Sequence, residues 1–158
     1  MNENFLAGLM TRHEDRGCMS HLRRCMDPGP SRVRGMALLA SFGVRVSNEA
    51  ESMPFKAVAR VFAMQKATHL GNERYNFAHT LRKAFIGQNG ESPFDKRFDA
   101  MVSCKSADTL IRAHLFKAAQ RLDSDCGINY RKLLKDLQTW DVDVINRWIE
   151  SYYGGRDA

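Results

Sequence analysis

The chain has 158 residues, of which 44% are hydrophobic and 27% are charged, and it carries a formal net charge of +6 with a sequence pI near 9.4. This length and composition are typical of one ordinary globular domain and exclude a disordered chain as the default interpretation. No apolar run reaches the roughly 18 residues that cross a bilayer, so we expect no membrane contact and a cytoplasmic protein.

Helical periodicity runs through nearly the whole chain, and no stretch shows the apolar–polar alternation of a strand. The fourth expected helix opens at Ser52, with Pro54 in its first turn, and ends at Gly71-Asn72. The expected helices cover 2–10, 14–26, 31–42, 52–70, 75–85, 92–102, 106–121, 130–140 and a last segment from near 141 or 143 to 153.

These helices predict an all-α fold, a compact bundle of about eight or nine helices. We expect a single helical domain over 1–158 that ends in a polar tail, 154–158. The loop near residues 87 to 91 could divide it into two small lobes, 1–88 and 91–153, although composition alone does not establish the division.

The positive charge is concentrated in one part of the sequence. Between Pro28 and Gly90 there are nine basic residues and three acidic ones, so this stretch accounts for the whole net charge of +6. A concentrated positive field favours polyanions such as nucleic acid, chiefly through release of counterions at the phosphates. The alternative interpretation is a solvated cationic surface.

Signatures of catalysis and metal binding are sparse. Cys18, His21 and Cys25 would share one helix face, but a zinc site needs a fourth ligand, and these residues are better explained as part of an apolar stripe. The carboxylate pairs Asp123-x-Asp125 and Asp141-x-Asp143 lack the partners of a two-metal site. We therefore expect no metal, no cofactor and no enzymatic activity.

The aromatic residues fall mostly at helix-core spacing. We predict that Tyr130, Leu134, Leu137, Trp140 and Trp148 are core residues. Tyr75, which follows Arg74 in a turn, is the plausible exception that could stack on a base. Phosphate contact, rather than base reading, is therefore indicated.

Several blocks of the sequence resemble the CasB family, the small subunits of the type I-E CRISPR Cascade complex. Residues 130–140 match Tyr-x-x-Leu-x-x-Asp-Leu-x-x-Trp, and 144–153 carry a near variant of Arg-x-Trp-x-x-x-Tyr-Tyr. Upstream, 15–24 resemble the family's Asp-Arg-Gly-x-x-x-x-Leu-Arg-Arg opening, and Lys96-Arg97-Phe98 followed by Ser106-Ala-Asp108 resembles its Arg-Arg-Phe helix and cap. The resemblance spans roughly 14 to 153.

The resemblance implies a helical, non-catalytic subunit present in two copies that lie head to tail. It implies contacts with the backbone and large subunits of Cascade, and sequence-independent binding of the hybrid between guide RNA and target DNA and of the displaced strand. This chain has His79 and His114-Leu115 where the family often carries arginine. The resemblance therefore does not carry an arginine contact with phosphate over to those two positions.

The candidate binding residues are basic. Among them, Arg23-Arg24, Lys56/Arg60 and Lys96-Arg97 are each opposite an apolar stripe on their own expected helix, so we expect them to point away from the core. Two alternatives are a helical DNA-binding transcriptional regulator and a metal-dependent nuclease. The candidate nucleic-acid-binding residues are Arg23, Arg24, Lys56, Arg60, Lys66, Arg82, Lys83, Lys96, Arg97, Arg112 and Lys117.

Overall fold

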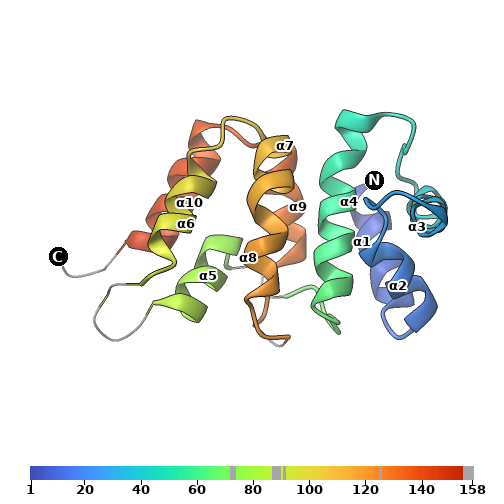
Figure 1. Cartoon of the computed structure of the whole chain (residues 1–158), viewed down its shortest axis with the longest axis horizontal. Coiled ribbons are helices and arrows are strands. Elements are labelled where there is room, and N and C mark those ends of the chain that lie inside the picture. The colour runs from blue at the N-terminus through green and yellow to red at the C-terminus, as the bar shows by residue number, and fades with distance from the viewer. Residues whose placement is uncertain (72–73, 87–89, 91, 125, 155–158) are drawn as a thin grey trace. The chain divides into compact units, whose positions relative to one another are not determined.

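A computed structural model describes residues 1–71, 74–86, 90, 92–124 and 126–154. Every regular element within those ranges is helical, which confirms the predicted all-α fold (Figure 1). None of the described helices is long and apolar enough to cross a membrane. The elements are α1 (Asn2–Arg12), α2 (Arg16–Arg23), α3 (Pro30–Ser41), α4 (Glu49–Met64), α5 (Phe77–Phe85), α6 (Asp95–Val102), α7 (Ala107–Leu110), the π-helical turn η1 (Ile111–Leu115), α8 (Phe116–Gln120), α9 (Tyr130–Gln138) and α10 (Val142–Tyr153).

The chain forms two compact units. The first is made mainly of Met1–Leu70 and holds α1 to α4, and the second begins at Gly71 and holds α5 to α10. The loop expected to divide the chain near 87 to 91 lies largely outside the described residues, as does most of the expected polar tail, 155–158.

In the first unit α2 packs against α3 and α4, and α1 contacts α4. Helix α4 begins at Glu49, not at Ser52 as expected, because the side chain of Asn48 accepts a hydrogen bond from the backbone N–H of Glu51 at 3.0 Å and caps the helix there. Pro54 consequently lies inside α4 and not in its first turn. Nearly every residue of α4 from Ser52 to Ala63 is buried, so this helix is covered on all sides.

The end of α4 is set by Lys66, and the expected end at Gly71 is wrong. Lys66 adopts a left-handed backbone with φ of 50°. Its N–H donates to the carbonyl of Ala63 at 3.2 Å, and the N–H of Ala67 donates to that of Phe62 at 3.1 Å. These two bonds form the Schellman motif that usually has glycine at the left-handed position, so the chain holds a lysine where a side chain is sterically unfavourable.

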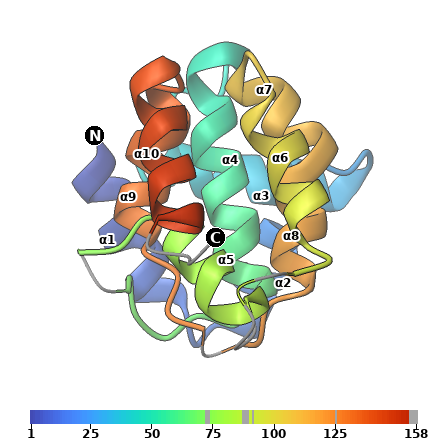
Figure 2. The ribbon, with the colours of Figure 1, turned by 90° about the vertical axis from the view of Figure 1, so that its left-hand side faces the viewer.

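In the second unit α10 packs against α5 and α6, as Figures 1 and 2 show from two directions. The side chains of Trp148 and Tyr152 on α10 are fully buried. The Tyr152 ring stacks on Phe98 of α6 with 3.9 Å between centroids, and its hydroxyl donates to the carboxylate of Asp95 at 2.8 Å. These contacts fix α6 against the C-terminal helix.

The predicted core of the second unit is largely correct. Tyr130, Leu134, Leu137 and Trp148 are buried. Trp140, also predicted to be a core residue, is only half-buried, and its indole N–H donates to the carbonyl of Cys104 at 2.9 Å. Such a hydrogen bond is common for tryptophan, because its indole N–H needs an acceptor when the ring is removed from water.

Candidate nucleic-acid interface

Within the described residues, basic side chains gather in the three hollows described below, one in the first unit and two in the second. The hollow of the first unit, here called the N-terminal basic pocket, has a volume of about 520 Å³. Arg23 from α2 and Lys66 from the end of α4 line it together, although 43 positions separate them in the sequence. It is lined by His13, Glu14, Arg16, Met19, Arg23, Ala63 and Lys66.

Lys56 contradicts the expectation that it points away from the core. It is only 3% exposed, and its ammonium lies 3.1 Å from the carboxylate of Glu49, seven residues earlier on the same helix. Arg60 is half-buried, with its guanidinium 3.6 Å from the carboxylate of Asp27. Arg23 and Arg24 are both exposed, but only Arg23 of these two residues lines the pocket. The buried position of Lys56 removes it from our proposed interface.

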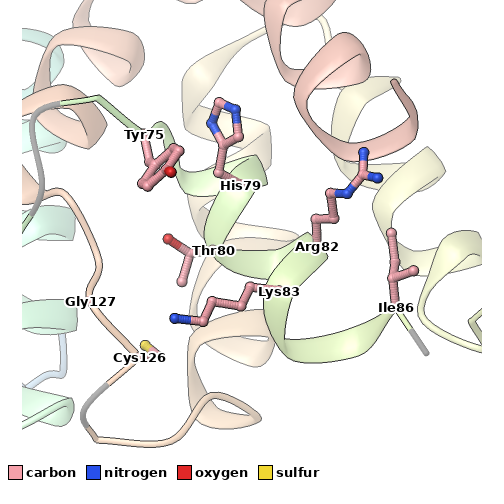
Figure 3. Close-up of a pocket in the computed structure, with 8 residues that line it drawn as sticks. All are labelled: Tyr75, His79, Thr80, Arg82, Lys83, Ile86, Cys126 and Gly127. Carbon is pink, nitrogen blue, oxygen red and sulfur yellow. The ribbon is translucent and has the colours of Figure 1, made fainter. Parts of the chain in front are cut away.

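The first hollow of the second unit, here called the tyrosine pocket, has a volume of about 560 Å³ (Figure 3). Arg82 and Lys83, which are adjacent on α5, leave the helix in different directions, and Lys83 extends toward the segment at Cys126 and Gly127. The guanidinium of Arg82 donates to the carbonyl oxygen of Gly154 just after α10. The lining residues are Tyr75, His79, Thr80, Arg82, Lys83, Ile86, Cys126 and Gly127.

His79 in this pocket is a helix cap rather than a cation. Its Nδ1 accepts a hydrogen bond from the backbone N–H of Asn76 at 3.1 Å, while the Asn76 side chain accepts from the N–H of His79 at 3.0 Å. The ring must therefore carry its proton on Nε2 and be neutral, since a protonated Nδ1 cannot accept. Burial, and then the charge of Arg82, lower the pKa of His79. A phosphate contact from a charged histidine here is accordingly unfavourable in the free protein.

The neutral state of His79 predicts an acid-sensitive stability. The folded protein takes up this proton less readily than the unfolded chain, whose histidine has its ordinary pKa of 6.5. The full contribution of neutral His79 to the free energy of unfolding is thus present above pH 6.5, and it is lost as the pH falls through the lowered pKa of His79 in the folded state. His79→Gln should keep the cap, because glutamine also accepts from the N-cap N–H, and should reduce the loss.

The measurement is the melting temperature of the parent and of His79→Gln at about pH 7.5 and about pH 5.5. Burial, followed by the charges of Arg97 and Lys117, also lowers the pKa of His114, so part of the acid sensitivity should remain in the variant. Equal shifts in the two proteins would contradict the cap assignment for His79.

The second hollow of the second unit, here called the α6 basic pocket, has a volume of about 370 Å³. Lys96 and Arg97 come from α6 and His114 from the π-helical turn η1, which packs on α6. The guanidinium of Arg121 lies over the rings of Phe85 and Phe94, at 5.4 and 5.3 Å from their centroids. The lining residues are Pro93, Lys96, Arg97, Ala100, His114 and Arg121.

The two other expected cations of this unit lie outside both hollows. Arg112 is exposed and forms an ion pair with Asp108, one turn earlier, at 3.0 Å. Lys117 is exposed on α8, and its charge acts on His114. Neither residue lines a pocket described above, but Lys117 adds to the positive field of the α6 basic pocket.

Sequence reasoning missed two cations that the structure brings into these hollows, Arg16 and Arg121. Arg16 is the first residue of α2, where it precedes the apolar stripe, and Arg121 is the residue that ends α8. Each therefore lies at an end of its helix rather than within a patterned face. For Arg16 the sequence does contain a signal. Asp15 is the N-cap of the helix, and it places Arg16 one turn before Met19 and two turns before Arg23 on the same helix.

Within the described residues no group of three His, Cys, Asp or Glu side chains could hold a metal ion. None of the four cysteines, all of which lie within the described residues, forms a disulfide bond. Burial raises the pKa of the Cys25 thiol to about 11, so that thiol is protonated and inert. Asp125, one half of a carboxylate pair noted in the sequence, lies outside the described residues.

The fold and the site thus define an all-helical protein with surface cations gathered in pockets. The family model of the CRISPR-associated protein Cse2 matches residues 19–153, so this chain belongs to the Cse2 family, which is the CasB family of the resemblance described above. Membership makes it a CRISPR Cascade subunit. Comparison with curated proteins gave no match, and comparison with solved structures gave none either.

Proposed function

We propose that this chain is a non-catalytic small subunit of a type I-E Cascade complex that holds nucleic acid by its phosphates, without reading sequence. It stabilises two parts of the target-bound complex, the hybrid between guide RNA and target DNA and the displaced DNA strand. Its partners in this role are the backbone and large subunits and a second copy of itself placed head to tail. In RNA-guided complexes base pairing selects the sequence, and protein contacts with the backbone shift a nearly balanced strand exchange.

The observation that carries the proposal is the grouping of cations from separate helices. Arg23 and Lys66 meet in the N-terminal basic pocket, and Lys96, Arg97 and Arg121 meet in the α6 basic pocket. Surface cations that only keep a protein soluble gain nothing from being brought together, because like charges repel. A bound polyanion would offset that repulsion. The candidate residues we retain from the sequence are Arg23, Arg24, Lys66, Arg82, Lys83, Lys96, Arg97 and Lys117.

The test is the binding of the purified chain to unrelated single-stranded and double-stranded oligonucleotides across a salt series. We expect weak binding to all of them, with affinity falling at least ten-fold between roughly 50 and 200 mM salt, because each neutralised phosphate releases counterions. Strong preference for one duplex sequence would instead support a helical transcriptional regulator. Binding that does not respond to salt would contradict the proposal.

A further inference from the structure

The tyrosine pocket differs from the other two hollows because an exposed aromatic side chain, that of Tyr75, lines it. Tyr75 is 49% exposed. Within the described ranges it is the one aromatic residue classed as exposed, whereas the others are buried or half-buried. An open tyrosine face is a surface on which a nucleobase can stack. Among the described residues, no Phe, Tyr or Trp lines either of the two basic pockets.

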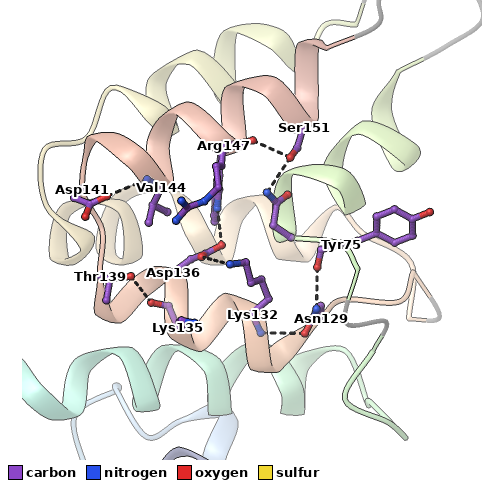
Figure 4. Close-up of polar contacts among 12 residues, drawn as sticks. Tyr75, Asn129, Lys132, Lys135, Asp136, Thr139, Asp141, Val144, Arg147 and Ser151 are labelled. Carbon is purple, nitrogen blue, oxygen red and sulfur yellow. Dashed lines mark hydrogen bonds and ion pairs between the residues drawn. The ribbon is translucent and has the colours of Figure 1, made fainter.

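The tyrosine is held in place through its backbone. The Nδ2 amide of Asn129 donates to the carbonyl of Tyr75 at 2.9 Å, and the Asn129 side-chain oxygen accepts from the N–H of Lys132 at 3.0 Å (Figure 4). The Tyr75 ring also contacts the His79 ring in a tilted arrangement, with 4.9 Å between centroids and 53° between planes. Because its backbone and one neighbouring ring already restrain Tyr75, stacking of a flat ligand costs less conformational entropy than it would on an unrestrained side chain, which favours binding.

Polar groups complete the pocket. The Thr80 hydroxyl and the Lys83 ammonium line the same hollow as the ring, and Figure 3 shows both on the side of α5 that faces Tyr75 and Gly127. Because Nδ1 of His79 is occupied by the Asn76 N–H, the ring carries its donor on Nε2. The volume of about 560 Å³ falls within the range of small-ligand sites, roughly 300–1,000 Å³.

We infer that the tyrosine pocket takes one unstacked base of a single nucleic-acid strand, with the base on the Tyr75 ring and an adjacent phosphate at Lys83. This inference rests on the proposed function and adds a subsite to it. A base within a duplex has both faces covered by its neighbours, so the occupant is a base from a single strand or one turned out of a hybrid. Stacking tolerates any base, since each has a π face, and the subsite therefore reads no sequence.

The probe is a short DNA strand in which 2-aminopurine alternates with thymine, and an RNA strand in which it alternates with uracil. The fluorescence of 2-aminopurine is quenched when it stacks on an aromatic ring. With the 158-residue chain at saturation we expect quenching of at least one strand. The strand that is quenched identifies whether DNA or RNA enters the pocket.

Three variants separate stacking from charge. Tyr75→Leu should abolish the quenching and weaken binding on the order of ten-fold, in keeping with one lost stacking contact. Tyr75→Phe should keep both, because phenylalanine retains the ring. Lys83→Met should weaken binding and reduce its salt dependence, while quenching persists at saturation. Tyr75→Leu should fold normally, since the hydrogen bond to Asn129 uses only the backbone of residue 75.

Two results would overturn the inference while leaving the proposed function intact. One is salt-sensitive strand binding without quenching by the parent protein. The other is quenching that Tyr75→Leu retains, which would place the base elsewhere. If the parent binds neither strand at about 50 mM salt, the proposed function fails and the subsite fails with it.

Discussion

Replacing Trp148 with alanine should lower the free energy of unfolding by about 3–5 kcal/mol, the usual cost of removing a large buried aromatic side chain. Trp148 has no exposed surface. Its ring contacts Phe77 of α5, with 5.8 Å between centroids, and Trp140, which meets it edge to face at 4.9 Å. The indole N–H donates to the carboxylate of Asp136 on α9 at 2.9 Å. One side chain therefore joins three segments of the second unit.

The hydrogen bond to Asp136 can be separated from packing. Asp136 is 1% exposed, and its carboxylate also lies 3.5 Å from the ammonium of Lys132 (Figure 4). Asp136→Leu should cost more than Asp136→Asn, because leucine leaves the buried indole N–H of Trp148 without an acceptor, a penalty of about 1–3 kcal/mol. Trp148→Phe in the Asp136→Leu background should recover part of the loss.

Denaturant unfolding of the four variants and the parent measures these differences, because the chain's two tryptophans report on the second unit. Trp148→Ala that unfolds at the same denaturant concentration as the parent would contradict the core assignment. Loss of strand binding with unchanged stability would instead make Trp148 part of a binding site.

Sequence periodicity predicted the helices well where one face is clearly apolar. Helix α10 has Val144, Trp148 and Tyr152 at successive turns, and all three are buried. The prediction from periodicity failed on α4, because the buried alanines of this helix were not counted among its apolar residues. Ala57, Ala59 and Ala63 are as fully covered as Phe55 and Phe62, and this leaves no solvent face for Lys56. A lysine on such a helix is retained by pairing with a carboxylate within reach, here Glu49.

Some single members of the candidate site were predictable from the sequence, but the pockets that they line were not. Basic pairs on single helices, such as Lys96-Arg97, are visible in the sequence and do line a hollow. Their companions come from other elements, as Arg121 does from the end of α8. Nothing in the sequence spacing of such residues predicts that they meet, because packing between helices decides it. The same holds for Lys66, whose place at the N-terminal basic pocket depends on its left-handed backbone.

Lys66→Gly provides a sharp test of what that lysine does. Glycine accepts a positive φ without steric cost, so this variant should be more stable than the parent by about 1 kcal/mol. It also removes one cation from the N-terminal basic pocket. A gain in stability accompanied by weaker strand binding would show that the residue is kept for its charge. Unchanged binding would indicate that the pocket holds no phosphate near Lys66.

Charge reversal at each basic pocket should weaken target-DNA binding by the assembled complex on the order of ten-fold or more, and equally for different guides. The variants are Arg23→Glu with Lys66→Glu, and Lys96→Glu with Arg97→Glu. Each puts carboxylates where phosphates are expected, and each lost phosphate contact should reduce the slope of log affinity against log salt by about one. Reversal at Lys56 is unsuitable, because it would bury a carboxylate beside Glu49 and unfold the protein.

The matched control is Lys105→Glu with Lys135→Glu, which changes the net charge by the same amount at two exposed lysines outside the three pockets. Target affinity is measured for reconstituted complexes with two unrelated guides at one salt concentration, after gel filtration has shown that each variant assembles. A general electrostatic effect would weaken the control as much as the pocket variants, because long-range attraction depends on net charge. Specific phosphate contacts would spare the control. If pocket variants that assemble bind the target as the parent does, the pockets are not the nucleic-acid interface.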